Sequence, residues 1–297
     1  MKTKKSTAVL FVLPFIVFFL LFWLVPFGYG VFMSLSKYSL VKGNEGLVGL
    51  DNYIKILFST SMYNKAFMLG LKNTVIFVLL TTPILVFGSL ALALLLDRLP
   101  DSIKGVFRTI YFASYSVSVT AVAAVFVWLM KGNGGYLNNM LINMGIIEKA
   151  IPWMEKQPYV WVALTVATVW WTVGYNMMLF VNSLNEIDPQ LYEASSIDGA
   201  GFWVQLRYII LPSIKNIFFF VLMTTIIASF NVYGQPRLMT QGGPGDSTRP
   251  LIMAITSTIM DRNDLGVGSA MTILMGIIIV ACSVGQYYLT REKEALR

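Results

Sequence analysis

The chain of 297 residues contains no histidine and only one cysteine, Cys282. Without histidine it lacks the commonest general base and metal-binding side chain, and a single cysteine excludes an intramolecular disulfide. The pattern G-x-x-x-x-G-K-[S/T], with which many proteins cradle nucleotide phosphates, is also absent. These absences argue against an enzyme and predict that the chain itself binds neither a metal nor a cofactor.

Charge is scarce as well, with 12% charged and 56% hydrophobic residues. Such a composition is typical of a membrane protein with several spans. The net charge of +7 could suggest a nucleic-acid partner. Because the basic residues are scattered at the ends of apolar runs, flanking of a membrane is the better interpretation.

Six apolar runs are each close to the ~20 residues that cross a bilayer. They cover residues 8–32, 73–96, 109–130, 159–181, 216–234 and 266–289. The first follows Lys2, Lys4 and Lys5, but it exceeds the apolar region of a cleaved signal peptide, which has about 7–15 residues. Six spans place both termini on one side, and basic residues in both tails favour the cytoplasm. The predicted fold class is an all-α membrane protein with six transmembrane helices.

The six runs contain no acidic or basic residue. Transporters driven by protons or ions typically place ionisable groups near the middle of the bilayer. A pore without them needs energy from a partner, although passive channels and facilitators also lack such groups.

A polar segment, residues 186–212, separates the fourth and fifth runs. It carries Glu186, Asp188, Glu193, Asp198 and Arg207. Since unpaired charges are costly in hydrocarbon, this segment must lie on one face of the membrane.

Within this segment the sequence predicts a pair of short helices. Asp188 can cap a helix whose first residue is Pro189. Gly199 permits a sharp reversal after that helix. Residues 202–208 can form the second helix, and Pro212 marks the turn into the next span.

The order of residues in this segment resembles the EAA loop of binding-protein-dependent ABC importer permeases. That loop reads E-A-A, three residues, G, nine residues, I, one residue and L-P. Here E-A-S begins at Glu193, the glycine is Gly199, and I-I-L-P ends at Pro212. Only Ser195, where alanine is usual, departs from it. The surrounding I-D-P-Q-L-Y and D-G-A-G resemble the carbohydrate-uptake branch, the maltose- and glycerol-phosphate-type permeases.

The resemblance implies a coupling helix that docks into a cleft on a cytosolic ATPase subunit. The residues implicated in this contact are Leu191, Tyr192, Glu193, Ala194, Ser195, Ile197, Asp198, Gly199 and Ala200.

The fourth and fifth runs also contain neutral polar and aromatic residues. The fourth has the cluster W-W-T-V-G-Y-N from Trp170, and the fifth has Thr224, Thr225, Ser229, Asn231 and Tyr233. Such a mixture suits a neutral, polar ligand, but helix contacts and interfacial aromatic residues are an alternative explanation. In maltose-type permeases these two spans build the substrate pocket. The resemblance therefore implies six substrate-binding candidates: Trp170, Gly174, Met177, Thr225, Ser229 and Asn231.

After the fifth run, T-Q-G-G-P-G-D-S-T is a turn-rich loop. It resembles the loop on which the extracytoplasmic solute-binding protein docks in the same family. The docking candidates are Gly242, Gly243, Pro244 and Gly245, and the alternative is an exposed turn without a partner.

The sequence thus predicts a first transmembrane helix with an extracytoplasmic segment (1–68), a permease core (69–290) and a cytoplasmic tail (291–297). We expect a permease subunit of an ATP-driven importer for sugars or oligosaccharides in the cell membrane of a prokaryote. The implied partners are a second, homologous permease subunit, two cytosolic ATPase subunits that hold ATP and Mg, and a solute-binding protein. A permease for a polyol, glycerol-phosphate or peptide, and a passive channel or facilitator, remain alternatives.

Overall fold

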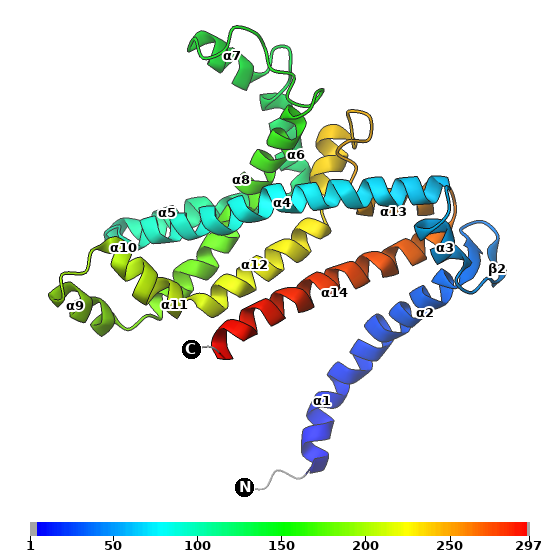
Figure 1. Ribbon diagram of the computed structural model, residues 1–297, viewed down its shortest axis with the longest axis horizontal. Helices are drawn as coiled ribbons and strands as arrows, with labels where there is room; N and C mark the ends of the chain where they lie inside the picture. The colour runs from blue at the N-terminus through cyan, green and yellow to red at the C-terminus, as the bar shows by residue number, and fades with distance from the viewer. Residues whose placement is uncertain (1–4, 296–297) are drawn as a thin grey trace. The chain divides into compact units, whose positions relative to one another are not determined.

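The computed structural model describes the backbone of residues 5–295 and the side chains of residues 9–288 (Figure 1). The chain forms two compact units, Met1–Met68 with Ala254–Ile278 (unit 1) and Leu69–Met253 with Ile279–Arg297 (unit 2). One boundary coincides with the predicted start of the permease core, but unit 1 also takes in Ala254–Ile278. Of the predicted tail 291–297, the last two residues lie outside the described part, as do Lys2 and Lys4.

Unit 1 begins with one long apolar helix. It comprises α1 (Lys5–Phe19), a π-helical turn η1 (Leu20–Leu24) and α2 (Val25–Ser34). The stretch Val9–Ser34 can cross a membrane, and no residue of its most apolar 18-residue window is buried inside the chain. It agrees closely with the predicted first span, and its apolar surface suits contact with lipid.

A small β-hairpin follows in unit 1, which the all-α prediction missed. Strands β1 (Ser36–Ser39) and β2 (Gly43–Leu47) pair antiparallel and lead to helix α3 (Asp51–Leu57). The buried Asn52 amide donates to the carbonyl oxygens of Ser34 and Ser36, both at 2.9 Å. These bonds hold the hairpin onto the end of α2.

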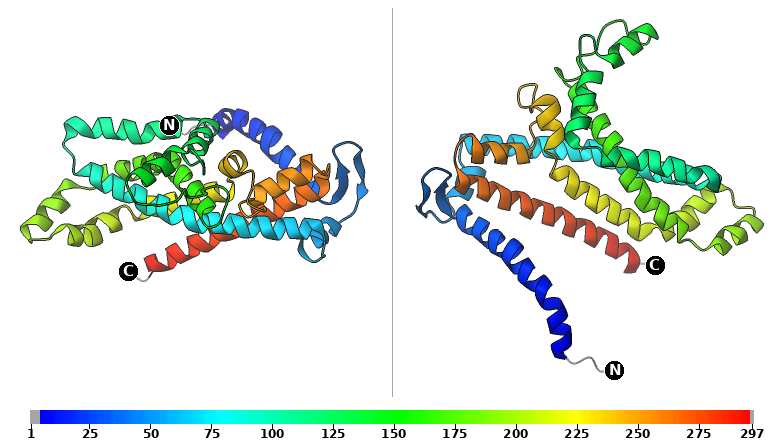
Figure 2. Two further views of the ribbon diagram at one scale, coloured as in Figure 1. Left: turned by 90° about the horizontal axis from the view of Figure 1, so that it is seen from above. Right: turned by 180° about the vertical axis from the view of Figure 1, so that it is seen from behind.

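The remaining regular elements of the described residues are helices joined by loops (Figure 2). Their order is α4 (Met62–Asp97), α5 (Asp101–Ala113), η2 (Ser114–Ser116), α6 (Val119–Leu129), α7 (Tyr136–Asn143), α8 (Tyr159–Asn185), α9 (Pro189–Ile197), α10 (Phe202–Gln205), η3 (Leu206–Ile210), α11 (Leu211–Ser213), α12 (Lys215–Phe230), η4 (Pro236–Thr240), α13 (Leu251–Met260) and α14 (Leu265–Ala295).

Four helices in the described part are long and apolar enough to cross a membrane, or up to six if two bent pairs each count as one span. The third predicted span, 109–130, is wrong as a straight helix. Asp101–Ser116 and Val119–Leu129 meet at 96°, because the extended Ser118 caps the start of α6 through the Ala121 amide. A second bend of 71° separates Phe202–Ser213 from Lys215–Phe230.

Helix α8 runs through the interior of unit 2. Val160 and Leu164 belong to a buried cluster that includes Val122 of α6. Near its other end, Met177 and Phe180 belong to a second buried cluster. Thus α8 contacts a packed core along its length, and its residues have little freedom to shift independently.

Helices α5 and α8 approach each other very closely at Gly174. A methyl group added there would overlap the carbonyl oxygen of Tyr111. Glycine is therefore required by packing at this position.

We expect Gly174→Ala to force α5 and α8 apart and to destabilise the protein by about 1–3 kcal/mol, as overpacked cores do. The measurement is thermal unfolding of the purified protein in detergent. The matched control is Gly105→Ala in α5, where an added methyl group meets no atom within 4 Å and should be neutral or stabilising by up to about 1 kcal/mol. Equal melting temperatures for the two variants would contradict the close approach.

Candidate functional site

The polar segment between α8 and α12 folds largely as predicted. The Asp188 carboxylate accepts a hydrogen bond from the Gln190 amide at 2.9 Å, and Pro189 occupies the first turn of α9. Gly199 has a left-handed backbone with φ of 72°, which reverses the chain at low steric cost. The capping and the reversal are therefore confirmed.

The second helix of this segment is longer than predicted. It begins at Phe202 and continues through the π turn η3 to Ser213. Pro212 lies inside its last turn, and the bend comes after it, before α12 begins at Lys215. We call residues 186–213 the α9 hairpin, which projects from the rest of unit 2 in every view (Figures 1 and 2).

One side of the α9 hairpin faces the second buried cluster. Tyr192 is half-buried against that cluster, and burial, aided by the Asp97 carboxylate, raises the pKa of its phenol above 10.0. The side-chain amide of Gln205 donates to the Ser195 hydroxyl at 2.9 Å. These contacts fix α9 against the helix that follows it.

The other side of the hairpin is exposed and carries both apolar and charged side chains. Ile197 is 87% exposed and Trp203 76% exposed. Of the nine predicted coupling residues, Tyr192, Ser195 and Ala200 are half-buried. The exposed ones are Leu191, Glu193, Ala194, Ile197, Asp198 and Gly199. Exposed apolar side chains gathered on a polar segment are typical of a protein-binding surface.

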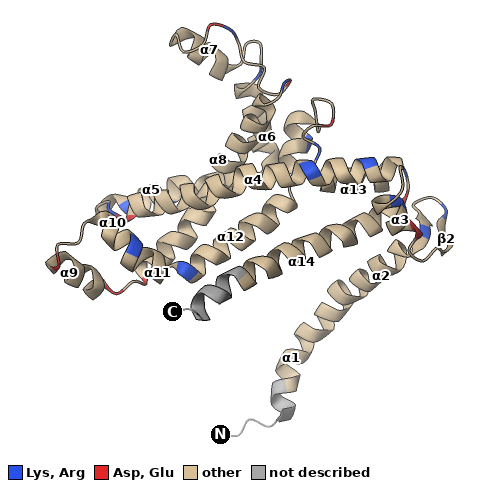
Figure 3. Ribbon diagram, viewed as in Figure 1, with Lys and Arg blue, Asp and Glu red and all other residues tan. Residues whose placement is uncertain are grey.

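The turn between α4 and α5 packs on this hairpin. The Arg98 guanidinium lies 3.9 Å from the centre of the Phe202 ring. Lys104 pairs with Asp101 at 3.3 Å in the first turn of α5, which follows. Charged residues gather around the hairpin, whereas α6 and α8 carry none (Figure 3).

A cavity of about 310 Å³ opens among α4, η2, α6, α8 and α12. Its volume is at the lower end of the roughly 300–1,000 Å³ typical of small-molecule sites. The residues that line it are Phe77, Leu85, Tyr115, Val119, Thr168, Trp171, Thr172, Tyr175, Asn176, Thr224, Thr225, Ala228, Ser229, Asn231, Val232, Tyr233, Gly234 and Gln235. None of these lining residues carries a charge.

Three aromatic rings form one wall of the cavity. Tyr115 stacks on Tyr175 with ring centres 4.9 Å apart and on Trp171 at 6.0 Å. The Trp171 indole donates to the Val117 carbonyl oxygen at 2.9 Å, which orients its ring. Trp171 and Tyr175 share a face because they are one helical turn apart.

Neutral polar side chains form another part of the lining. The buried Asn176 amide donates to the Thr225 hydroxyl at 3.0 Å, which joins α8 to α12. The Ser229 hydroxyl lies 3.3 Å from the Thr81 hydroxyl. Both contacts hold lining residues in fixed positions.

Only half of the predicted substrate residues line this cavity. Thr225, Ser229 and Asn231 do so, and a contact with a solute stays a prediction. The other three lie on other faces of α8: Trp170 is half-exposed beside Phe126, Gly174 packs on α5, and Met177 is fully buried in the core.

The three candidates on α8 therefore lie away from this cavity, and Trp171, Tyr175 and Asn176 of the same cluster line it; a solute contact of any of them stays a prediction. Helical spacing from Thr168 through Trp171 and Tyr175 could have indicated the face of α8 that lines the cavity. Tyr115 and Gln235 come from other elements, and no sequence signal pointed to them.

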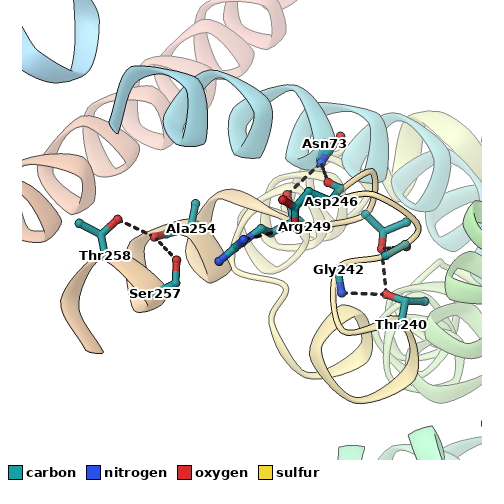
Figure 4. Close-up of polar contacts among 10 residues, drawn as sticks. Asn73, Thr240, Gly242, Asp246, Arg249, Ala254, Ser257 and Thr258 are labelled. Atoms are coloured by element: carbon teal, nitrogen blue, oxygen red, sulfur yellow. Dashed lines mark hydrogen bonds and ion pairs between the residues drawn. The ribbon is translucent and has the colours of Figure 1, made fainter. Parts of the chain in front are cut away.

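The loop that contains G-G-P-G is a compact turn anchored to α4 (Figure 4). The Asn73 amide donates to the carbonyl oxygens of Asp246 at 2.9 Å and Arg249 at 3.0 Å. Within the loop, the Thr248 hydroxyl donates to the Gly243 carbonyl oxygen at 2.6 Å. Gly242 is buried, Gly243 and Pro244 are half-buried, and Gly245 is exposed.

Comparison with known proteins identifies the class of protein. Residues 56–293 match the family described as "Binding-protein-dependent transport system inner membrane component". The probable ABC transporter permease YurN of Bacillus subtilis is 30% identical over 98% of this chain and 99% of its own. The lactose transport permease LacF of Rhizobium radiobacter is 28% identical over 96% and 94%.

Solved structures share the fold. Two crystal structures of a bacterial transporter of the acidic polysaccharide alginate, one including an alginate pentasaccharide-bound periplasmic protein, each have a TM-score of 0.81. They cover 97% of this chain and 96% and 95% of the solved chains, at 19% and 20% identity. The chain belongs to the family of inner membrane components of binding-protein-dependent transport systems.

We expect Asn73→Leu to loosen the loop 240–249, because it removes two hydrogen bonds. The Arg249 carbonyl oxygen loses its side-chain donor, and the Asp246 carbonyl oxygen keeps only the Arg249 amide. A loss of about 2–3 kcal/mol is the expected size. Hydrogen–deuterium exchange should show the Thr248 amide exchanging roughly 10- to 100-fold faster. Asn182→Leu, at an exposed position of α8, is the control, and unchanged protection at Thr248 in the Asn73 variant would refute the anchoring role.

Proposed function

We propose that this chain is one of two pore subunits of an ATP-driven ABC importer for sugars or oligosaccharides. Membership of the permease family supports the transport role. Two observations support a sugar as the transported solute: relatives such as the lactose permease LacF, and the uncharged cavity with an aromatic wall in unit 2.

The observation that carries the proposal is the α9 hairpin. It is a charged, capped helix pair with exposed Leu191, Ile197 and Trp203, joined directly to two long apolar helices. We assign this surface to a cleft on a cytosolic ATPase subunit, with one ATPase subunit for each permease subunit. ATP and Mg would be held by those ATPase subunits.

The same proposal sets the topology. Six spans result if each bent pair crosses once, and both termini then lie in the cytoplasm together with the α9 hairpin. The loop with Gly242, Gly243, Pro244 and Gly245 then lies outside, where a solute-binding protein would dock. A second, homologous permease subunit would complete the pore.

Transport follows from movement of the α9 hairpin. Closure of the ATPase dimer on ATP draws the two hairpins together, and the permease pair rocks from inward-facing to outward-facing. The binding protein then releases its solute toward the cavity. The bias between the two states comes from contacts of the hairpin that differ between open and closed ATPases.

The direct test is purification of the tagged chain in mild detergent, identification of the proteins that accompany it, and reconstitution of that complex in proteoliposomes. Uptake of a labelled saccharide should require both ATP and the binding protein. Uptake at the same rate without ATP would identify a passive facilitator instead.

Gly199→Val should uncouple ATP hydrolysis from uptake. A β-branched residue in the left-handed region costs about 1–2 kcal/mol, and a backbone that relaxes this strain re-orients α9. We expect uptake to fall roughly tenfold or more while ATP hydrolysis continues.

The control is Gly199→Asn, because asparagine tolerates the left-handed conformation and no atom lies within 4 Å of an added Cβ at Gly199. Wild-type coupling is expected for it. Normal transport by the valine variant would count against the role of the hairpin.

A further inference from the structure

Gln235 is a largely buried residue whose side-chain amide forms no hydrogen bond with the described part of the chain. It is 4% exposed, lies between α12 and η4, and lines the cavity. None of the side-chain hydrogen bonds found among the described residues involves it. The Gln235 amide is not among the fully buried polar atoms that lack a partner, so it keeps some accessible surface, and Gln235 lines the cavity. A polar group in this position is available to a ligand in the cavity.

The backbone around Gln235 is held firmly. Its neighbour Gly234 packs so closely on α6 that an added methyl group would lie 2.7 Å from a methyl carbon of Val119. The Arg237 amide donates to the Tyr233 carbonyl oxygen at 3.0 Å. Gln235 therefore reaches the cavity from a fixed position, as a binding residue must.

The cavity offers Gln235 complementary neighbours. The Asn176 amide nitrogen is bonded to Thr225, which leaves the Asn176 carbonyl oxygen as a free acceptor among the described contacts. The Gln235 amide can both donate and accept. Adjacent hydroxyl groups of a sugar also donate and accept, and the wall of Tyr115, Trp171 and Tyr175 can cover the C–H face of a sugar ring.

The same lining disfavours anions. No lining residue is basic, and an ionised carboxylate or phosphate buried without a counter-charge is strongly unfavourable. The faces of the three rings are electron-rich and repel negative charge.

We propose that Gln235 is a specificity-determining residue that holds a neutral saccharide in this cavity, and that the site discriminates against uronates and sugar phosphates. This inference rests on the proposed function.

The test uses the complete complex in proteoliposomes, with ATP and the binding protein. Neutral saccharides of one to three rings, lactose among them, are compared with uronate saccharides of equal length. Gln235→Met keeps the length of the side chain and removes both hydrogen-bonding groups, and Gln235→Glu keeps the shape and adds a charge. Gln157→Met, in the exposed loop before α8, is the control.

Wild type should take up neutral saccharides at least roughly 10-fold faster than uronates, and both Gln235 variants should lose roughly 10- to 100-fold of that uptake. The melting temperature of Gln235→Met should be unchanged or higher, because an amide that bonds no other residue contributes little to the stability of the fold. The control should transport normally.

Three results would overturn the inference. A marked fall in the melting temperature of Gln235→Met would assign Gln235 a structural role, and undiminished uptake would remove it from the site. Faster uptake of uronates would reject the neutral class while leaving the proposed function intact. If no saccharide enters in an ATP-dependent way, the proposed function itself fails.

Discussion

Helix α8 is packed on both sides of its middle, with Val160 and Leu164 in one buried cluster and Met177 and Phe180 in the other. Its middle lines the cavity through Trp171, and its end leads into the α9 hairpin. A helix held in this way cannot shift one side chain without its neighbours, because protein interiors are close-packed. A displacement of α9 would therefore reach the cavity as movement of a rigid element, which is what coupling to a separate ATPase requires.

Helix α4 also contacts the cavity and leads to the α9 hairpin, and in addition it holds the loop 240–249. Asn73 holds the loop 240–249, Phe77 and Leu85 line the cavity, and Arg98, just past the end of α4, stacks on Phe202 of the hairpin. The distance from Asn73 to Asp97 is roughly 36 Å at the helical rise of 1.5 Å per residue, somewhat more than the ~30 Å of hydrocarbon. One continuous helix thus links the loop, the cavity and the hairpin.

Local chemistry was predictable wherever neighbours in sequence decide the structure. The first backbone amides of a helix have no partner inside it. Asp188 supplies an acceptor for one of them, and Pro189 has no amide hydrogen to satisfy. Gly199 ends the helix because glycine tolerates the left-handed region. The bend at Ser118 was missed, since an apolar run looks continuous whether or not one serine caps a new helix. The hairpin 36–47 was missed because Asn52, which holds it, binds carbonyl groups 16 and 18 residues earlier in the chain.

The sequence by itself determined the membrane class, most of the helices and the polar hairpin, because hydropathy, capping and turn residues act over a few positions. Only the tertiary structure decided which face of α8 meets the cavity: Trp171, Tyr175 and Asn176 line it, whereas the predicted Trp170, Gly174 and Met177 do not. It also brought Tyr115 and Gln235 to the same space from distant segments. The physical reason is that a lining depends on how helices pack side by side, and that arrangement is set by contacts between residues far apart in the chain.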